Sequence, residues 1–183
     1  MGGPQLLGLY NTMVLPHLQY CLINWGNFVG DGNVGLSREI LTLQKSLVRI
    51  ISASHSISHA DPLFFKCGTL KIDDLYKQTV RLFSFKAQRG LLPSGMSTLF
   101  NMVSGNHAYN TRASRNNFYF SGQSVRYNSI RYIVPSNWNG LSTNLKEARN
   151  ISSFKKGSKG EFLSSYSNFS CDMHNCRSCT LGP

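Results

Sequence analysis

Residues 109–163 of this chain read YNTRASRNNFYFSGQSVRYNSIRYIVPSNWNGLSTNLKEARNISSFKKGSKGEFL. Lysine and arginine side chains crowd this stretch, and only Glu147 and Glu161 oppose them. Aromatic residues lie between the cations. Cations neutralise phosphates and aromatic rings stack on bases, so this composition is typical of nucleic-acid binding. A small basic fold that binds nothing can have the same composition, and both interpretations stay open at this point.

Two short strands are predicted inside this stretch. Asn117–Phe120 and Ser129–Val134 are rich in aromatic and β-branched residues and are joined through Gly122, which indicates a small β-hairpin element. A final helix is expected from Ser152 to about Tyr166. The fold class that follows is mostly α with a small β-hairpin, in which a helical part precedes a basic α/β module.

Trp138 is predicted to lie in a loop, because Pro135 and Gly140 flank it. Tryptophan buries a large apolar area when it is packed. We therefore interpret Trp138 as a core anchor of the basic stretch, rather than as a platform for base stacking.

Upstream of the basic stretch, apolar residues recur at helical spacing. Helices are predicted over residues 4–25, where Pro16 should kink or break the helix, and over residues 37–52. A short helix should begin at Asp61 and Pro62 and end at Gly68. The first of these helices carries more apolar surface than it can bury by itself, so it should need a partner.

Helix 37–52 is predicted to be amphipathic, with Ser37 as its cap. Its apolar face should consist of Ile40, Leu43, Leu47, Ile50 and Ile51. At about 100° per residue, the opposite face gathers Arg38, Lys45 and Arg49. Such a cationic stripe either contacts phosphates or is an ordinary solvated face.

Asp73 and Asp74 resemble the paired carboxylates of a polymerase only superficially. The polymerase motif places an aromatic-Ala-Asp-Asp sequence on a turn between strands. Here the pair opens a helix that ends at Gly90, where acidic side chains cap N–H groups and favour the helix dipole. Lys77 and Arg81, one turn apart on this helix, are further candidates for phosphate contact.

Several short motifs occur in a fixed order along the chain. They are Leu18-Gln19-Tyr20-Cys21, Leu43-Gln44-Lys45, Tyr109-Asn110-Thr111-Arg112, Trp138-Asn139-Gly140-Leu141 and Phe154-Lys155-Lys156. This ordered set resembles the region that follows the polymerase core in LINE-type, jockey-like non-LTR retrotransposon reverse transcriptases. The resemblance covers roughly residues 4–165. It departs from the family at Ser142, where the family usually has proline.

The resemblance implies a helical thumb-like region over residues 1–103, a basic aromatic module over 104–166, and a Cys-rich tail over 167–183 for which we expect disorder. It implies binding to RNA or to an RNA–DNA template–primer duplex, without recognition of the base sequence. The catalytic carboxylates of the parent RNA-directed DNA polymerase are absent, so the chain alone should not be an enzyme. No cofactor is expected, and the missing polymerase core is a candidate partner. The predicted nucleic-acid-binding residues are Arg38, Lys45, Arg49, Lys77, Arg81, Arg112, Arg115, Arg126, Arg131, Lys155 and Lys156.

A formal net charge of +11 over 183 residues favours a polyanionic partner. No apolar run approaches the roughly 20 residues that a membrane span needs, and the first residues do not form a secretory signal. We expect an intracellular protein, in the nucleus or the cytoplasm, with no membrane contact.

The last residues contain four potential zinc ligands, Cys171, His174, Cys176 and Cys179. A structural zinc site normally joins two separated ligand pairs, and the spacing here is tighter. These residues are therefore only weak candidates, and no metal site is predicted. Two other classes of function stay open: a non-functional truncated retroelement remnant, and a domesticated interaction or zinc-binding adaptor.

Overall fold

The computed structural model of this chain describes residues 2–26, 34–103, 116–119, 129–168 and 170–171. Within these ranges the chain is mostly helical and contains no strand. The elements are α1 (Gly3–Leu9), the π-helical turn η1 (Tyr10–Val14), α2 (Leu15–Gln19), α3 (Leu22–Trp25), α4 (Val34–Ile51), α5 (Ala60–Cys67), α6 (Ile72–Gln88), α7 (Ser94–Ser97), α8 (Ile130–Asn139), α9 (Thr143–Lys146) and α10 (Ile151–Ser167). The prediction of a mostly α fold is confirmed.

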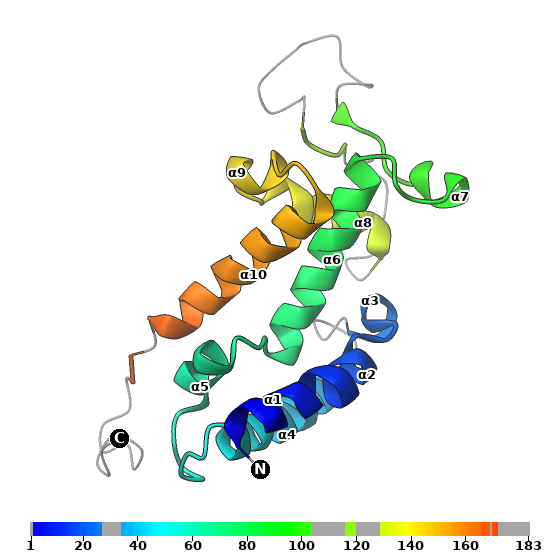
Figure 1. The fold of residues 1–183 in the computed structure, drawn as a ribbon. Helices are drawn as coiled ribbons and strands as arrows, with labels where there is room; N and C mark the ends of the chain where they lie inside the picture. Colours follow the sequence, from blue (N-terminus) through cyan, green and yellow to red (C-terminus); the bar gives the residue numbers. More distant parts are fainter. Residues whose placement is uncertain (1, 27–33, 104–115, 120–128, 169, 172–183) are drawn as a thin grey trace.

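Two long helices, α6 and α10, connect the two ends of the molecule (Figure 1). At one end α1 and α4 lie side by side, and α5 packs between α4 and α10. At the other end α8 packs against α6, and α9 packs against α10. Both α6 and α10 therefore contact elements from each end. No helix in the described part of the chain has the length and apolar character needed to cross a bilayer.

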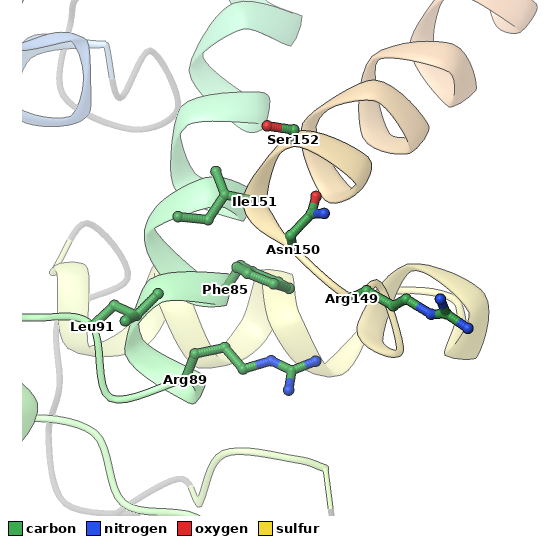
Figure 2. Close-up of a pocket in the computed structure, with 7 residues that line it drawn as sticks. All are labelled: Phe85, Arg89, Leu91, Arg149, Asn150, Ile151 and Ser152. Carbon is green, nitrogen blue, oxygen red and sulfur yellow. The ribbon is translucent and has the colours of Figure 1, made fainter.

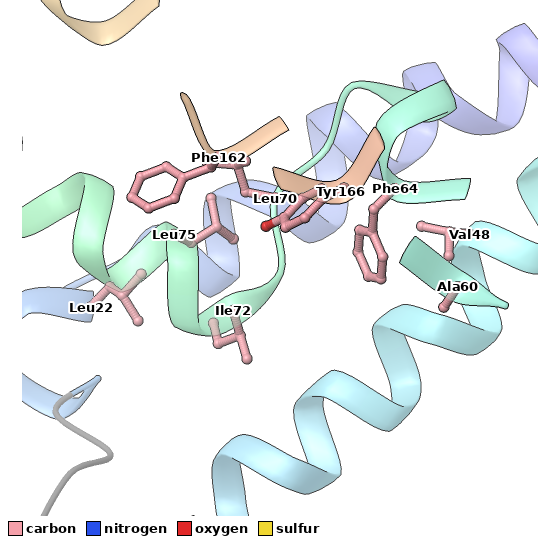
Figure 3. Close-up of a cluster of buried hydrophobic side chains, with 9 residues drawn as sticks. All are labelled: Leu22, Val48, Ala60, Phe64, Leu70, Ile72, Leu75, Phe162 and Tyr166. Atoms are coloured by element: carbon pink, nitrogen blue, oxygen red, sulfur yellow. The ribbon is translucent and has the colours of Figure 1, made fainter. Parts of the chain in front are cut away.

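The first cluster of buried side chains lies where α3, α4, α5, α6 and α10 meet (Figure 3). Its members are Leu22, Val48, Ala60, Phe64, Leu70, Ile72, Leu75, Phe162 and Tyr166. Burying a large apolar side chain contributes about 1.5–3 kcal/mol each. Phe162 and Tyr166 of α10 therefore pack against residues at least 87 positions earlier in the chain, since Leu75 is the nearest of them in sequence.

The second cluster surrounds Trp138, which is fully buried. Its indole ring stacks on Phe154 of α10 at a centroid distance of 6.2 Å and meets Phe118 edge-on at 6.0 Å. The indole Nε1–H donates a hydrogen bond of 2.6 Å to the carbonyl oxygen of Asn116. The prediction that Trp138 is a core anchor is confirmed.

The position of Trp138 differs from the prediction, because residues 130–139 form the helix α8 rather than a strand followed by a loop. Ser129 caps this helix, and its Oγ accepts a hydrogen bond of 3.3 Å from the backbone N–H of Arg131. Val134, Pro135 and Trp138 are buried, and residues at these spacings share one face of a helix but not of a strand. Burial at these spacings outweighs the β-propensity of the branched and aromatic residues, which is a weak preference that packing overrides.

In its described part, residues 117–119, the other predicted strand forms an isolated antiparallel bridge between Met102 and Phe118. The side-chain amide of Asn139 pairs with the backbone of Phe118 on the other side: its Oδ1 accepts from the N–H at 2.9 Å, and its Nδ2 donates to the carbonyl at 3.0 Å. A side chain on α8 thus takes the place of a second strand beside Phe118. The predicted hairpin is not formed, because its second strand is a helix.

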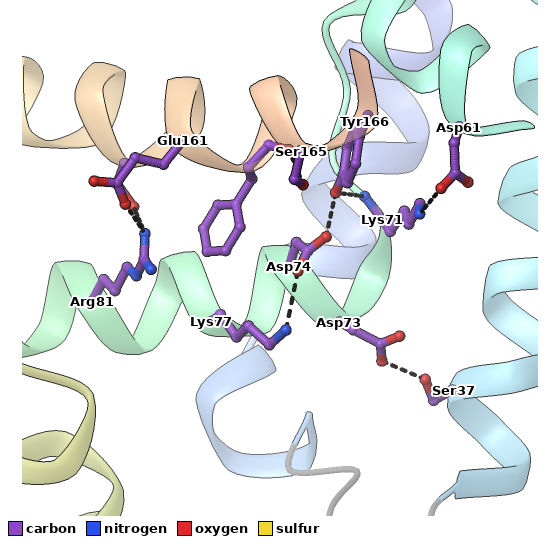
Figure 4. Close-up of polar contacts among 12 residues, drawn as sticks. Ser37, Asp61, Lys71, Asp73, Asp74, Lys77, Arg81, Glu161, Ser165 and Tyr166 are labelled. Atoms are coloured by element: carbon purple, nitrogen blue, oxygen red, sulfur yellow. Dashed lines mark hydrogen bonds and ion pairs between the residues drawn. The ribbon is translucent and has the colours of Figure 1, made fainter. Parts of the chain in front are cut away.

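Most predicted helices are confirmed, with shifted starts. Gly68 ends α5 in the left-handed region at φ 61°, as predicted. Helix α4 begins at Val34, so Ser37 lies inside it and is not its cap. The Ser37 hydroxyl instead donates a hydrogen bond of 2.6 Å to Asp73 at the start of α6 (Figure 4).

Pro16 does not break the first helical segment. The backbone stays helical from Gly3 to Gln19, and the π-helical turn η1 lies directly before α2, which contains Pro16, so the irregularity that proline causes is accommodated inside the helix. The break comes at Tyr20 and Cys21, and Cys21 adopts a left-handed φ of 50°.

Candidate nucleic-acid interface

Three lysines lie close together on the N-terminal half of α10. Asn150 begins this helix, and its Oδ1 accepts a hydrogen bond of 2.8 Å from the N–H of Ser153. At about 100° per residue, Lys155, Lys156 and Lys159 fall within one sector of the helix. Lys155 and Lys156 are exposed, and Lys159 is partly buried. The inward sector of the same helix carries Phe154 and other core residues.

Lys159 was not among the predicted binding residues, although it lies one turn beyond Lys155. Burial lowers the pKa of Lys159, and the nearby positive charge of Lys155 lowers it further. Lys155 and Lys159 lie one turn apart on α10, close enough for their charges to repel each other. An anion placed between them would relieve this repulsion. The spacing of four residues inside the predicted helix was the signal that could have identified Lys159.

Helix α4 places its three predicted cations in different situations. Arg38 is exposed and Lys45 is partly buried, and neither side chain has a partner among the described residues. The Nε–H of Arg49 donates a hydrogen bond of 3.0 Å to the carbonyl oxygen of Ser58. Arg49 therefore holds the segment between α4 and α5, while Arg38 and Lys45 remain available for a ligand.

The apolar face predicted for this helix is partly wrong. Leu43 and Ile50 are 65% and 63% exposed, whereas the polar side chain of Gln44 is 1% exposed. Gln44 is buried because it bonds to three groups: its Nε2 donates to Tyr10 Oη and to Leu70 O, and its Oε1 accepts from the N–H of Ile72. The buried face is centred on Gln44, and Leu43 lies outside it.

Two predicted cations on α6 are engaged with carboxylates (Figure 4). Arg81 pairs with Glu161 of α10 at 3.0 Å, donates to the Ser158 hydroxyl at 3.2 Å, and lies over the ring of Phe162 at 4.3 Å. Its side chain is only 17% exposed. Arg81 therefore joins α6 to α10 and has little surface left for a phosphate.

Lys77 contacts Asp74 at 3.3 Å across one turn of α6, but more than half of its side chain is exposed. Asp74 also accepts a hydrogen bond from the Tyr166 hydroxyl, so its charge is shared. A phosphate would have to compete with this carboxylate for Lys77. Lys77 is thus a weaker candidate than the exposed lysines of α10.

The remaining predicted cations lie elsewhere. The side chain of Arg131 is exposed in the first turn of α8. Arg112, Arg115 and Arg126 lie outside the described residues. The structure therefore places Lys155 and Lys156 together and shows Arg38, Lys45 and Arg131 on other elements.

The aspartates at the start of α6 have structural partners rather than an open metal site. Asp73 accepts from Ser37, Asp74 accepts from Tyr166 and pairs with Lys77, and Asp61 pairs with Lys71 at 2.7 Å. The first-turn position of the pair is confirmed, since α6 begins at Ile72, but neither carboxylate caps the helix. The cap comes from Gln44, as described above.

In the described part of the chain no three His, Cys, Asp or Glu side chains come close enough to hold a metal ion. Of the four weak zinc candidates, only Cys171 is described, as a free thiol. His174, Cys176 and Cys179 lie outside the described residues.

Comparisons of this chain with protein-family models, with curated proteins and with solved structures find no match. The resemblance to LINE-type reverse transcriptases therefore stays a prediction that rests on its motifs.

Proposed function

We propose that this chain binds the backbone of RNA or of an RNA–DNA hybrid, without reading sequence, through the exposed cationic sector of α10. The observation that supports the proposal is the row of Lys155, Lys156 and Lys159 on one face of a helix whose other face is fixed in the core. Side chains on a rigid helix keep a defined spacing at a small entropic cost. Lysine acts on phosphates as a point charge and so favours backbone contact over base recognition.

Within this proposal the chain is a thumb-like fragment of a non-LTR retrotransposon reverse transcriptase that lacks the palm active site. Two observations support this assignment. The helical part of the chain agrees with the thumb-like region that the motifs predict. The carboxylates of Asp61, Asp74 and Glu161 pair with lysine or arginine side chains of the protein rather than forming a metal site. The fragment would not polymerise by itself, because phosphoryl transfer requires carboxylates that hold two metal ions. It would act inside the cell, in the nucleus or the cytoplasm, beside a polymerase core. The predicted β-hairpin is not retained, since α8 replaces one of its strands.

A salt titration tests this function directly. Affinity for an RNA–DNA hybrid and for single-stranded RNA is measured by fluorescence anisotropy over a series of salt concentrations. Binding by phosphate contacts predicts a linear fall of log affinity with log salt, the same slope for unrelated sequences, and preference for the hybrid. Absence of binding at low salt, despite the net charge of +11, would overturn the proposal.

A second candidate, a piece that folds only beside a larger partner, is favoured by the first helical segment. Met13 and Tyr20 are 63% and 76% exposed, and Leu9 is also exposed. Large apolar side chains that cluster on a surface mark interaction sites or aggregation. Sedimentation of the wild type and of a Met13→Lys variant distinguishes the two candidates. Self-association that the substitution abolishes would favour the second candidate, and a monomeric wild type would favour the first.

A further inference from the structure

A pocket of about 490 Å³ lies where the end of α6 meets the start of α10 (Figure 2). Its lining residues are Phe85, Arg89, Leu91, Arg149, Asn150, Ile151 and Ser152. The volume falls within the range of roughly 300–1,000 Å³ that is typical of small-molecule sites. Two of the lining residues are arginines and none is acidic, so the pocket selects for an anion.

The apolar and charged walls of this pocket are separate. In Figure 2, Phe85, Leu91 and Ile151 gather on one side, and the guanidinium groups of Arg89 and Arg149 lie on the other. A ligand with an anionic group and an apolar or aromatic part would match both walls. A free metal ion or a cationic ligand would match neither.

Arg89 is held in place before any ligand arrives. Its Nη2 donates a hydrogen bond of 3.0 Å to the carbonyl oxygen of Ala148, and its guanidinium lies 5.4 Å from the centre of the Phe85 ring. The remaining N–H groups of this guanidinium have no partner among the described residues. Because its rotamer is already fixed, binding an anion costs less conformational entropy there than at an unconstrained side chain.

Arg149 is exposed, and no described residue pairs with its side chain. It comes directly before Asn150, the cap of α10. The Asn150 side chain occupies the N–H of Ser153, which leaves the N–H groups of Ile151 and Ser152 without an acceptor in the described part of the chain. The cavity and the two guanidinium groups are the main basis of the site. The two backbone amides add two further hydrogen-bond donors.

We propose that this pocket binds the phosphate group of a nucleotide, with Arg149 and Arg89 as its main contacts. Guanidinium groups suit phosphate because they offer parallel donors at fixed geometry. Ser152 lies one turn before Lys155 and Lys156, so the pocket continues the cationic sector of α10. This inference rests on the proposed function: the pocket would seat one phosphate of a nucleic-acid strand, or the phosphate of a free nucleotide.

The test is a titration of isotope-labelled protein followed by NMR, with ionic strength held constant. The probes are inorganic phosphate, adenosine monophosphate, adenosine, and a short RNA strand that has no terminal phosphate. Phosphate and adenosine monophosphate should shift the amide signals of Ile151 and Ser152, and adenosine should not. Arg149→Ala should weaken adenosine monophosphate binding about tenfold, the loss of one charge-assisted contact, whereas Lys66→Ala on α5 should leave it unchanged.

The RNA strand identifies the source of the phosphate. Shifts of Ile151 and Ser152 with this strand assign the pocket to a backbone phosphate, and shifts with the monophosphate alone assign it to a terminal phosphate or a free nucleotide. The inference is overturned if phosphate and the monophosphate leave both amides unshifted, or if Arg149→Ala binds like the wild type. If phosphate and the monophosphate leave the pocket amides unshifted while an RNA–DNA hybrid shifts the signals of Lys155 and Lys156, this inference is overturned and the proposed function stands. Saturable phosphate binding in the pocket without any affinity for nucleic acid would overturn the proposed function and leave the phosphate site standing.

Discussion

The side-chain Oε1 of Gln44 accepts a hydrogen bond of 2.8 Å from the backbone N–H of Ile72, so the first residue of α6 is capped from the middle of α4. The same side chain donates to Tyr10 and to the carbonyl oxygen of Leu70. One buried amide therefore connects three segments. A helix start that is buried without such a partner would leave its N–H groups unsatisfied.

Replacing Gln44 with alanine should destabilise the fold by about 3 kcal/mol, because it leaves buried polar groups without partners and opens a cavity. Urea unfolding followed by circular dichroism measures this change. Ser46→Ala, at an exposed position of the same helix, should change the free energy of unfolding by less than about 0.5 kcal/mol. Equal effects of the two substitutions would contradict the capping role of Gln44.

Arg81 should contribute to stability more than to binding. Arg81→Ala is expected to lower the free energy of unfolding by about 1–2 kcal/mol. This is less than the cost of breaking a fully buried ion pair, because Glu161 is 44% exposed and solvent screens the interaction. A double-mutant cycle with Glu161→Gln separates the ion pair from the contact with the Phe162 ring. If Arg81→Ala instead left stability unchanged and weakened RNA binding, the assignment of Arg81 to the α6–α10 contact would be wrong.

Lys155 and Lys156 should carry part of the salt dependence of binding. Replacing both with alanine should reduce the slope of log affinity against log salt by about 1.4–1.8, since each phosphate contact contributes about 0.7–0.9. The matched control is the pair Lys66→Ala and Lys86→Ala, which removes the same charge from exposed sites on α5 and α6. If both double variants reduced the slope equally, net charge rather than α10 would account for binding.

Binding should also depend on pH through Lys159. Burial and Lys155 lower the pKa of Lys159 below its ordinary value of 10.5, so this side chain loses its charge at lower pH than a lysine with an ordinary pKa. Affinity for nucleic acid should fall through that pH range, and a bound phosphate should raise the pKa again. Lys159→Arg should remove this alkaline decrease, because arginine stays protonated. A pH series of anisotropy titrations on both proteins measures the effect.

Tyr166 should make the fold sensitive to alkaline pH. Burial, and then the hydrogen bond to Asp74 and its negative charge, raise the pKa of Tyr166 well above 10.0. The unfolded chain therefore loses this proton first, and stability that is complete below pH 10 falls by about 1.4 kcal/mol per pH unit above it. Tyr166→Phe should be less stable near neutral pH, and its deficit should shrink above pH 10. Tyr10 and Tyr76, whose pKa values burial also raises, should leave a residual slope in the variant.

The sequence predicted the long helices because local signals specify them. Gly68 ends α5, and the acidic pair lies in the first turn of α6. Helix α10 runs from Ile151 to Ser167, within a residue of the predicted bounds. In each case a turn residue and an apolar repeat of helical period point to the same structure.

The errors arose where contacts distant in sequence decide the structure. The residues of α8 favour a strand locally, but Val134, Pro135 and Trp138 are all buried, and residues at these spacings share one face of a helix but not of a strand. The burial of Gln44 could not be predicted from the helical period, because its partners Tyr10, Leu70 and Ile72 lie more than 20 residues away in the sequence. In the candidate site, the exposure of Lys155 and Lys156 could be predicted from the helical period of α10 alone. The engagement of Arg49 and Arg81 depends on partners that periodicity does not reveal.

Helices α6 and α10 each contribute side chains to both clusters of the interior: Leu75 and Phe162 to one, and Phe85 and Phe154 to the other. Neither end can therefore come apart while the other keeps its packing, since the same two helices would have to be ordered and disordered at once. We therefore expect α6, α10 and the helices that pack against both clusters to unfold together. Local opening of α10 would cost nearly the full free energy of unfolding, and this keeps its lysines at fixed spacing for as long as the molecule is folded.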